Sequence, residues 1–479
     1  MDDKYLAVDQ GTSATKAMLF NRQGVILGSA KEAYEVYNKG RGYIEQDPEE
    51  LFAAAVHTAR EAMGDCTSGE VVTLGLSVQT GAFLLWDKST GQAVTPVIAW
   101  QCRRGKAYLD SLSEKELEEF SRIVSEKPEP DGVPEKLAQV FRENPELIKL
   151  AWEKRLLFGT METWLLWKLT NGRTHKSDVT NACITRLYLE KEERWNQETL
   201  AYLGIPVDIF PQVVDNDDDF GEVCIPGLEG IRIHGSMGDS AAAMFGEGCW
   251  KQGQSKITYG TGASYLVHLG NQKEWNALPD TFLGWKTDGI CHYVWEGTLP
   301  HVGSSIQWIQ KLGIIQSVGE TESLAKSLSD NGGVYFLPQV QVAGREQNLF
   351  WGADFFSGRE HIARAVLESI GFRIWEMQQL LLNAGIKMEK EIRADGGMSV
   401  NGFLMQFQAD LLQQQVISNQ HPDISAYGAF LMAAYGAGRI TLEEILEMEH
   451  KNQQYQPGMS EGKRQQLLEE WQKIRKEMQ

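Results

Sequence analysis

The sequence lacks several features that would place it in well-known classes of protein. Its 479 residues contain no run of 18 apolar residues, and residues 1–9 do not form a signal peptide, so we expect no membrane-spanning segment and no secretion. Its six cysteines are scattered without any Cys-x-x-Cys spacing, which argues against a zinc site or a disulfide framework. A reducing, cytoplasmic location is therefore the prediction.

Basic residues are also scarce. The chain has 46 Lys and Arg against 65 Asp and Glu, which gives a net charge of −19 and a pI near 5.0. Nucleic acids and anionic membrane surfaces bind basic protein faces, so we expect neither as a partner. A nucleotide is still compatible with this charge, because a divalent cation and backbone amides can bind its phosphates.

Three sequence motifs that mark common enzyme classes are missing. No Walker A motif is present, since neither Gly105-Lys106 nor Gly462-Lys463 is followed by Ser or Thr. No Gly-x-Gly-x-x-Gly follows a strand, which removes the best support for a dinucleotide enzyme. His-Glu-x-x-His is absent too, so a zinc protease of the usual pattern is excluded.

What the chain does contain is an alternation of strand and helix patterns, which predicts an α/β fold with mixed sheets. Residues 5–8, 14–20 and 25–27 read as three strands. Asp47 then begins a helix as its N-cap, with Pro48 at the first position and Glu50 at the third. Residues 113–170 read as mainly helical. Later segments are predicted as strands at 71–77, 83–86, 97–100, 264–269 and 334–337, and as helices at 361–382, 403–412, 426–435 and 460–479.

The stretch from residue 231 to residue 262 carries the main candidate for chemistry. A short apolar strand ends in Gly235-Ser-Met-Gly238, and Asp239 precedes a run of good helix formers. We predict Asp239 as the N-cap of that helix, with its carboxylate held ionised by the helix N-terminus. Such a carboxylate can accept the proton of a substrate hydroxyl during phosphoryl transfer. The alternative is a purely structural cap.

Three glycine turns, each after a predicted strand, could gather around one polyphosphate: Gly11-Thr12-Ser13, Gly260-Thr261-Gly262 and Gly396-Gly397. Taken singly, such turns are usually only turns. Asp9 ends the first strand and is a candidate ligand of Mg²⁺ through water, or else a cap of the turn.

Residues 6–13 and 256–263 repeat the same unit of strand, Gly-Thr turn and strand, about half the chain apart. This repeat predicts two similar lobes, each with one phosphate-binding hairpin. The Gly-dotted stretch 246–253 is suited to a hinge, so we predict lobes at 1–247 and 248–479.

With these motifs in order, the chain resembles the FGGY family of carbohydrate kinases, and most closely its glycerol kinase branch. The resemblance covers nearly the whole length. The segments that carry it are residues 7–13, 98–104, 163–172, 178–182, 238–239, 258–262, 305–308, 395–401, 403–410 and 455–459.

The resemblance implies two ribonuclease-H-like lobes of the actin and hexokinase type with a central cleft, the carbohydrate site in the N-terminal lobe and the nucleotide site in the C-terminal lobe. ATP and Mg²⁺ are the implied cofactors, a small carbohydrate is the implied partner, and a homodimer is an assembly that the sequence leaves open. Asp239 would be the general base, and Asp9 and Asp239 would serve the metal. The implied nucleotide contacts are Gly11, Thr12, Ser13, Gly260, Thr261, Gly303, Gln307, Gly397 and Asn401, and the implied substrate contacts are Gln79, Thr80, Gly81, Trp100, Asp131, Asp239 and Ser240.

The chain departs from the glycerol kinase pattern where the substrate would bind. Thr80 and Gly81 stand where that branch carries an Arg-Glu pair that binds glycerol hydroxyls, Asp131 falls where a Tyr is expected, and Ser240 replaces a Gln. A site built to bind particular hydroxyls discriminates by factors on the order of 10⁴. We therefore expect glycerol to be a poor substrate, and a longer polyol or a ketose such as a pentulose to be a better one.

Two other functions are compatible with the same residues. One is a non-catalytic sugar or nucleotide sensor that has kept the fold, which the altered substrate loop would favour. The other is an actin-like or chaperone-type ATPase with a protein client. Retention of Asp9, Asp239 and the glycine turns favours the kinase.

Overall fold

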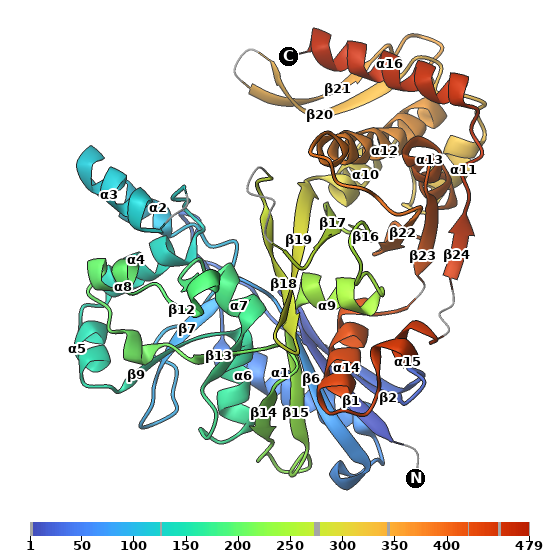
Figure 1. Ribbon diagram of the computed structural model, residues 1–479. Helices are drawn as coiled ribbons and strands as arrows, with labels where there is room; N and C mark the ends of the chain where they lie inside the picture. The colour runs from blue at the N-terminus through green and yellow to red at the C-terminus, as the bar shows by residue number, and fades with distance from the viewer. Residues whose placement is uncertain are drawn as a thin grey trace. The chain divides into compact units, whose positions relative to one another are not determined.

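The computed structural model describes residues 3–124, 127–272, 278–342, 345–419, 421–448 and 452–478 (Figure 1). The chain forms two compact units. Unit 1 comprises Met1–Gly248, Phe282–His292 and Asp423–Met448, and unit 2 comprises Cys249–Thr281, Tyr293–Pro422 and Glu449–Gln479. Two segments from the second half of the chain thus complete unit 1. The lobe boundary after residue 247 stays a prediction.

Unit 1 is built on a six-stranded mixed sheet in the order β14-β15-β6-β1-β2-β3. β1, β6 and β15 run parallel at its centre, and β2, β3 and β14 are antiparallel to their neighbours. The strands are β1 (Lys4–Gln10), β2 (Ala14–Asn21), β3 (Ile26–Ala33), β6 (Val71–Val78), β14 (Asp219–Glu222) and β15 (Arg232–Gly238).

The central strands are buried on both faces, as parallel strands covered by helices are. One face of β1 presents Leu6 and Val8 to the core beneath α1 (Pro48–Met63) and α6 (Met161–Leu169). The other face presents Tyr5, whose ring lies 5.3 Å from that of Phe430 in α14 (Ile424–Gly436). This alternation is the period of two expected of a strand.

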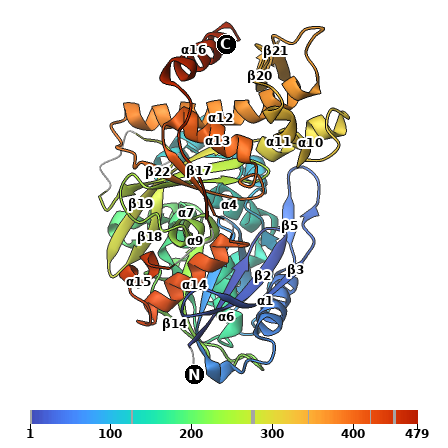
Figure 2. The same ribbon diagram turned by 90° about the vertical axis from the view of Figure 1, so that its right-hand side faces the viewer.

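Helix α14 comes unusually close to the elements around it. A Cβ on Gly75 of β6 would lie 2.1 Å from the carbonyl oxygen of Ala429, and a Cβ on Gly428 would lie 1.8 Å from that of Ala242 in α9 (Asp239–Gly246). Glycine is needed at both positions because main chains meet there. Figure 2 shows α14 lying beside α9, as these contacts require.

A second, five-stranded sheet in unit 1 follows the order β4-β5-β8-β7-β9 and is covered by short helices. Its strands are β4 (Tyr37–Asn38), β5 (Ile44–Gln46), β7 (Phe83–Asp87), β8 (Val97–Ile98) and β9 (Leu156–Thr160). The remaining elements of unit 1 are α2 (Gly105–Leu109), α3 (Glu114–Val124), α4 (Val133–Glu143), α5 (Glu146–Trp152), α7 (Val179–Ile184), α8 (Gln197–Tyr202), α15 (Leu442–Leu446), β10 (Lys176–Asp178), β11 (Tyr188–Leu189), β12 (Arg194–Trp195) and β13 (Gln212–Val214).

Unit 2 repeats the central arrangement of unit 1. Its strands belong to a seven-stranded sheet of the order β18-β19-β17-β16-β22-β23-β24, with β16, β22 and β23 parallel and β17 antiparallel to β16. Residues 282–287 of β18 and 290–292 of β19 fall in the segment assigned to unit 1. The strands of this sheet are β16 (Ser255–Tyr259), β17 (Ala263–Gly270), β18 (Thr281–Thr287), β19 (Ile290–Leu299), β22 (Glu391–Asp395), β23 (Gln415–Asn419) and β24 (Asn452–Tyr455). A separate hairpin is formed by β20 (Tyr335–Val342) and β21 (Arg345–Trp351). The helices of unit 2 are α10 (Val302–Lys311), α11 (Glu320–Lys326), α12 (Arg359–Asn383), α13 (Gly402–Leu412) and α16 (Glu461–Glu477).

The predicted α/β class is confirmed, and so is the repeated hairpin. β1–β2 and β16–β17 are both antiparallel pairs joined by a Gly-Thr turn, next to parallel strands. Asp47 caps α1 by accepting hydrogen bonds from Glu49 N at 2.8 Å and Glu50 N at 3.2 Å. Among the described residues, none of the helices is both apolar enough and of sufficient length to span a bilayer.

The stretch 113–170 is mainly helical as expected, with α3, α4, α5 and α6, but β9 interrupts it. The five residues of β9 are all buried and pair with β7, so tertiary pairing overrides the local pattern there. One local prediction was wrong. Asp239 is the first residue of α9 and not its N-cap, because β15 continues through Gly238 and that glycine takes the cap position.

We expect Gly428→Ala to lower the free energy of unfolding by about 1–3 kcal/mol, because the new methyl group must displace the main chain of α9. Urea-induced unfolding, followed through a signal from unit 1, measures this free energy. Gly69→Ala is the matched control, since a Cβ there meets no atom within 4 Å. Equal midpoints for the two variants would contradict the close approach.

Candidate functional site

The register of three parallel strands defines one edge of the unit 1 sheet. Gln10, the last residue of β1, pairs with Val78, the last of β6, and Val78 pairs with Gly238, the last of β15. The carboxyl ends of the three strands therefore coincide. The sheet brings to one edge three residues that lie at or directly after these strand ends, although up to 230 positions separate them in the chain: Asp9, Gln79 and Asp239. Ligands of open α/β sheets bind at such an edge.

Asp9 is buried in an environment crowded with negative charge. Its side chain accepts a hydrogen bond from Ser77 Oγ at 2.6 Å. Burial, followed by the nearby carboxylate of Asp423 and more weakly that of Asp239, raises the pKa of Asp9 to about 8, although Ser77 and Lys16 act in the opposite direction. A cation placed here would relieve the repulsion.

Lys16 and Asp423 are site residues that our sequence reasoning missed. Lys16 on β2 forms a short ion pair with Asp423, the N-cap residue of α14. Burial by itself would lower the pKa of Lys16, but Asp423 and Asp9 raise it overall. A signal existed in the sequence, because Asp is a favoured N-cap and Asp423 stands just before the helix predicted at 426–435.

Asp239 begins α9 at the sheet edge and is partly exposed. Its Oδ1 accepts a hydrogen bond from the main-chain N–H of Ser240 at 2.8 Å, and its carbonyl oxygen accepts one from Ser425 Oγ at 3.2 Å. An acidic side chain in the first turn is stabilised by the helix dipole. The position suits an ionised carboxylate that faces a ligand.

A buried polar cluster holds the end of β15 from behind. Ser236 Oγ donates to Asp178 Oδ2 at 2.7 Å, and Gly238 N donates to Thr180 Oγ1 at 3.3 Å. Burial raises the pKa of the Asp178 carboxyl, although four hydrogen bonds oppose that shift. The 178–182 motif thus fixes the strand that leads into Asp239.

The first glycine turn, residues 11–13, is held by hydrogen bonds from buried and half-buried side chains. Tyr34 Oη and Gln10 Nε2 both donate to the carbonyl oxygen of Gly11, and Gln46 Nε2 donates to that of Thr12 at 2.6 Å. Ser13 is exposed at the tip. Gln79, predicted as a substrate contact, is instead 1% exposed and donates to Gln46 Oε1 at 3.0 Å, so it supports the turn.

Three of the predicted substrate residues, Thr80, Gly81 and Trp100, form a wall beside this turn. The methyl group of Thr80 packs on Gly238, where a Cβ would come within 2.4 Å of it. Gly81 has a φ of +71° and lies against Trp100, whose indole Nε1 donates to Thr12 Oγ1 at 3.0 Å. Trp100 is 49% exposed, so its ring is available to a ligand. Asp131 is exposed on the turn before α4.

The second glycine turn, in unit 2, joins β16 to β17. Gly260 N donates to the carbonyl oxygen of Gly262 at 2.8 Å, and Gly303 N in the first turn of α10 donates to that of Gly260 at 3.2 Å. The 396–397 turn packs on the same strand end, because a Cβ on Gly396 would lie 2.5 Å from the carbonyl oxygen of Tyr259. Unit 2 therefore gathers Gly260, Thr261, Gly303 and Gly397 at one place.

The two remaining predicted nucleotide contacts differ in character. Gln307 is exposed one turn along α10, whereas Asn401 is buried as the N-cap of α13. The Asn401 side chain accepts from Leu404 N at 3.0 Å and donates to Thr321 Oγ1 at 3.1 Å. In this conformation its amide fixes the start of α13.

The residues present fit a magnesium nucleotide. A Cβ on Gly397 would meet no atom within 4 Å and one on Gly260 only the carbonyl oxygen of Gly262 at 3.7 Å, so the main chain at these glycines is open to a phosphate. Within the part of the chain that the structure describes, no three His, Cys, Asp or Glu side chains converge as a metal site. Mg²⁺ is commonly held by one or two carboxylates together with substrate phosphates, and Asp9 with Asp239 can supply those.

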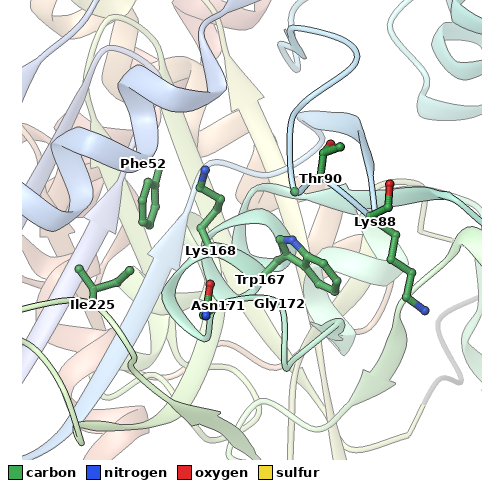
Figure 3. A pocket seen from close by; sticks show the side chains of 10 residues that line it. Phe52, Lys88, Thr90, Trp167, Lys168, Asn171, Gly172 and Ile225 are labelled. Atoms are coloured by element: carbon green, nitrogen blue, oxygen red, sulfur yellow. The ribbon is translucent and has the colours of Figure 1, made fainter.

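A separate pocket of about 540 Å³ lies elsewhere in unit 1, around Trp167 and Lys168 (Figure 3). None of the residues that line it is a predicted site residue. Its Lys168 already pairs with Glu49 at 2.8 Å. The pocket is thus distinct from the sheet edge that carries Asp239.

The chain is similar to known proteins over nearly its whole length. Residues 4–246 match the family model of the N-terminal domain of the FGGY family of carbohydrate kinases, and residues 255–437 match that of its C-terminal domain. Glycerol kinase 1 of Thermotoga maritima is 34% identical over 485 residues, covering 97% of each chain. Glycerol kinase of Clostridium beijerinckii is 35% identical over 98% of this chain and 97% of its own.

Solved structures share the fold. Plasmodium falciparum glycerol kinase with ADP superimposes with a TM-score of 0.91 at 24% identity, covering 100% of this chain and 98% of that one. Xylulose kinase from Lactobacillus acidophilus superimposes with a TM-score of 0.82 at 20% identity, covering 99% and 98%. The two-lobed actin and hexokinase type of fold is confirmed.

We expect Asp9→Asn to stabilise the protein at alkaline pH. The folded pKa of about 8 lies above the ordinary 3.8, so the folded state binds this proton more tightly and loses stability as pH rises between those values. The amide that replaces the carboxyl carries no charge, so the variant should gain on the order of 2 kcal/mol over wild type near pH 8.5 and little near pH 4. Urea unfolding at both pH values measures the gain. The exposed Asp110→Asn should change stability by less than about 0.5 kcal/mol; an equal gain in both variants would refute the crowding of charge at Asp9.

Proposed function

We propose a substrate class and a role for each site residue, starting from the fact that this chain belongs to the FGGY family of carbohydrate kinases. It is accordingly a phosphotransferase with an alcohol group as acceptor, and its substrate is a sugar or polyol. Our proposal is that Asp239 is its general base, that ATP with Mg²⁺ is the donor, and that glycerol is not the preferred acceptor. The observation that carries it is the meeting of Asp9 and Asp239 at the carboxyl ends of the parallel strands β1 and β15 in one mixed sheet.

Asp239 is placed to take the proton of the attacking hydroxyl. Its carboxylate starts a helix, which stabilises the anion, and the Ser240 N–H holds one of its oxygens. In a loose phosphoryl-transfer transition state the proton leaves late, so a carboxylate of ordinary basicity suffices. The larger part of the rate enhancement then comes from positioning of the two reactants.

Each unit has one glycine turn suited to phosphate. Thr12 and Ser13 in unit 1, and separately Gly260 and Thr261 in unit 2, have main-chain N–H groups and hydroxyls of the kind that bind phosphate oxygens. Bound Mg²⁺ would neutralise charge on the transferred group, with Asp9 and Asp239 as its protein ligands. Lys16 adds a cation beside Asp9 and reduces the repulsion that the phosphates would meet there.

The substrate wall favours an acceptor larger than glycerol. Gly81 lacks a side chain and its positive φ would strain any other residue, and the Thr80 side chain is turned onto Gly238. Neither position therefore supplies a charged group to short hydroxyl chains. The exposed ring of Trp100 offers an apolar surface of the kind that packs against a sugar or a longer polyol. A ketose such as a pentulose fits this description.

The alternative is a sugar or nucleotide sensor of the same fold, favoured by the departures at Thr80 and Gly81. Catalytic turnover distinguishes the two. A homodimer and a cytoplasmic location remain our predictions for this enzyme.

We expect Asp239→Asn to lower kcat by roughly 10²–10⁴ while the dissociation constant of the sugar stays within about threefold, because the amide keeps the shape but cannot accept the proton. Coupled ADP release and calorimetry measure the two quantities. Asp110→Asn serves as an exposed control. Wild-type-like turnover by Asp239→Asn would exclude the base role, and sugar binding without turnover by wild type would favour the sensor.

A screen of C3 to C7 polyols, aldoses and ketoses tests the substrate class. We expect glycerol to be turned over with a kcat/KM at least ~100-fold below that of the best acceptor, because the wall lacks charged partners for its hydroxyls. The best acceptor should have five or more carbons. Glycerol turnover equal to that of every other compound would refute the argument.

A further inference from the structure

Lys136 in α4 is a fully buried lysine whose ammonium group contacts three main-chain carbonyls. Its side chain is 0% exposed. Nζ donates to the carbonyl oxygens of Gly81 at 3.0 Å, Ala99 at 3.2 Å and Trp100 at 3.2 Å. Buried lysines are rare because desolvation of the charge is costly, so a fully buried lysine indicates a specific structural role.

The three acceptors belong to two separate segments of the chain. Gly81 lies in the loop between β6 and β7, and Ala99 and Trp100 directly follow β8. An ammonium group has three N–H donors and each finds one carbonyl, so Lys136 satisfies both segments at once. A neutral amine has only two donors, so one of the three carbonyls would lose its bond to Lys136.

The same segments form the wall proposed for the substrate. Trp100 connects this wall to the first glycine turn through the bond from its indole Nε1 to Thr12 Oγ1. A shift of the Trp100 main chain would therefore move both the ring that faces the sugar and the hydroxyl that faces the phosphate.

The charged groups around Lys136 leave its proton sensitive to pH. Burial lowers the pKa of Lys136 to about 8, with Arg104 acting in the same direction and Cys102, Asp131 and Glu135 opposing it. Two of these neighbours have other partners, since Glu135 pairs with Arg186 at 3.1 Å and Arg104 pairs with Glu45. Near neutral pH most molecules retain the ammonium, and above pH 8 most lose it.

We propose that Lys136 is a positioning residue for the sugar, which fixes Gly81 and Trp100 relative to each other and, through Trp100, to the Thr12 turn. This inference rests on the proposed function, because the wall is the proposed sugar site. It assigns to α4 a role beyond packing, because this helix carries the cation that holds the wall in place.

Lys136→Met tests the role, since methionine has a similar length and no charge. Loss of the three bonds should raise the sugar KM and dissociation constant by roughly 10–100-fold, lower kcat by less than about fivefold and leave the KM of ATP within about threefold. Steady-state kinetics and calorimetry with the best acceptor from the screen measure these values, after a thermal melt confirms folding.

Lys168→Met is the matched control, because Lys168 is a part-buried lysine of unit 1 that pairs with Glu49 away from the wall. It should leave sugar affinity unchanged. Sugar affinity of Lys136→Met equal to wild type would overturn the inference and leave Lys136 as an anchor of α4.

A second measurement uses pH. Sugar affinity is titrated between about pH 6.5 and 9.5 in wild type and in Lys136→Met, because the pKa of Asp9 and that of Glu162 are also about 8 and only a fall that Lys136→Met lacks reports on Lys136. Affinity should fall above pH ~8 in step with loss of the Lys136 proton, whereas a flat profile overturns the inference. Both measurements use binding, so a chain that binds sugar without turnover would refute the kinase chemistry and still report on Lys136.

Discussion

Repulsion among carboxylates at the carboxyl edge of the unit 1 sheet is the constraint on which the rest of the structure depends. Asp9, Asp239 and Asp423 come from three distant parts of the chain and lie within electrostatic reach of one another. Burying such groups together is unfavourable unless a cation accompanies them. Lys16 provides part of that compensation, and a magnesium nucleotide would provide the remainder. The edge is thus arranged for a ligand at the expense of stability, as functional sites commonly are.

The supporting structure keeps this edge in shape. Parallel register aligns the three strand ends, the Asp178 cluster holds the end of β15, and the glutamine network of Gln10, Gln46 and Gln79 holds the first glycine turn. Hydrogen bonds to the main chain dominate these contacts. Such bonds fix where a residue stands without dictating which ligand it binds, which allows one fold to serve acceptors as different as glycerol and xylulose.

Much of this arrangement could be predicted from the sequence, because the informative signals are local. The glycine turns, the cap of α1 and the small-residue helix after Asp239 are each encoded within a few residues. The contact between Lys16 and Asp423 could not be predicted, since 407 positions separate the two and no local pattern connects them. The role of Lys136 was hidden for another reason: its partners are carbonyl groups, which every residue carries. Gln79 was assigned to the substrate because neighbouring positions define that loop, yet its side chain is buried and donates to Gln46.

The helix α14 has a consequence for how the protein is made. It covers the face of β1 that carries Tyr5, and its Phe430 stacks on Phe20 at 4.7 Å, yet it is contributed by residues near the end of the chain. While the ribosome is still producing unit 2, the N-terminal sheet has been synthesised but one of its apolar faces lacks its cover. The aromatic face with Tyr5 and Phe20 therefore stays uncovered until residues 424–436 have been synthesised, and exposed apolar surface of this kind makes nascent chains prone to aggregation.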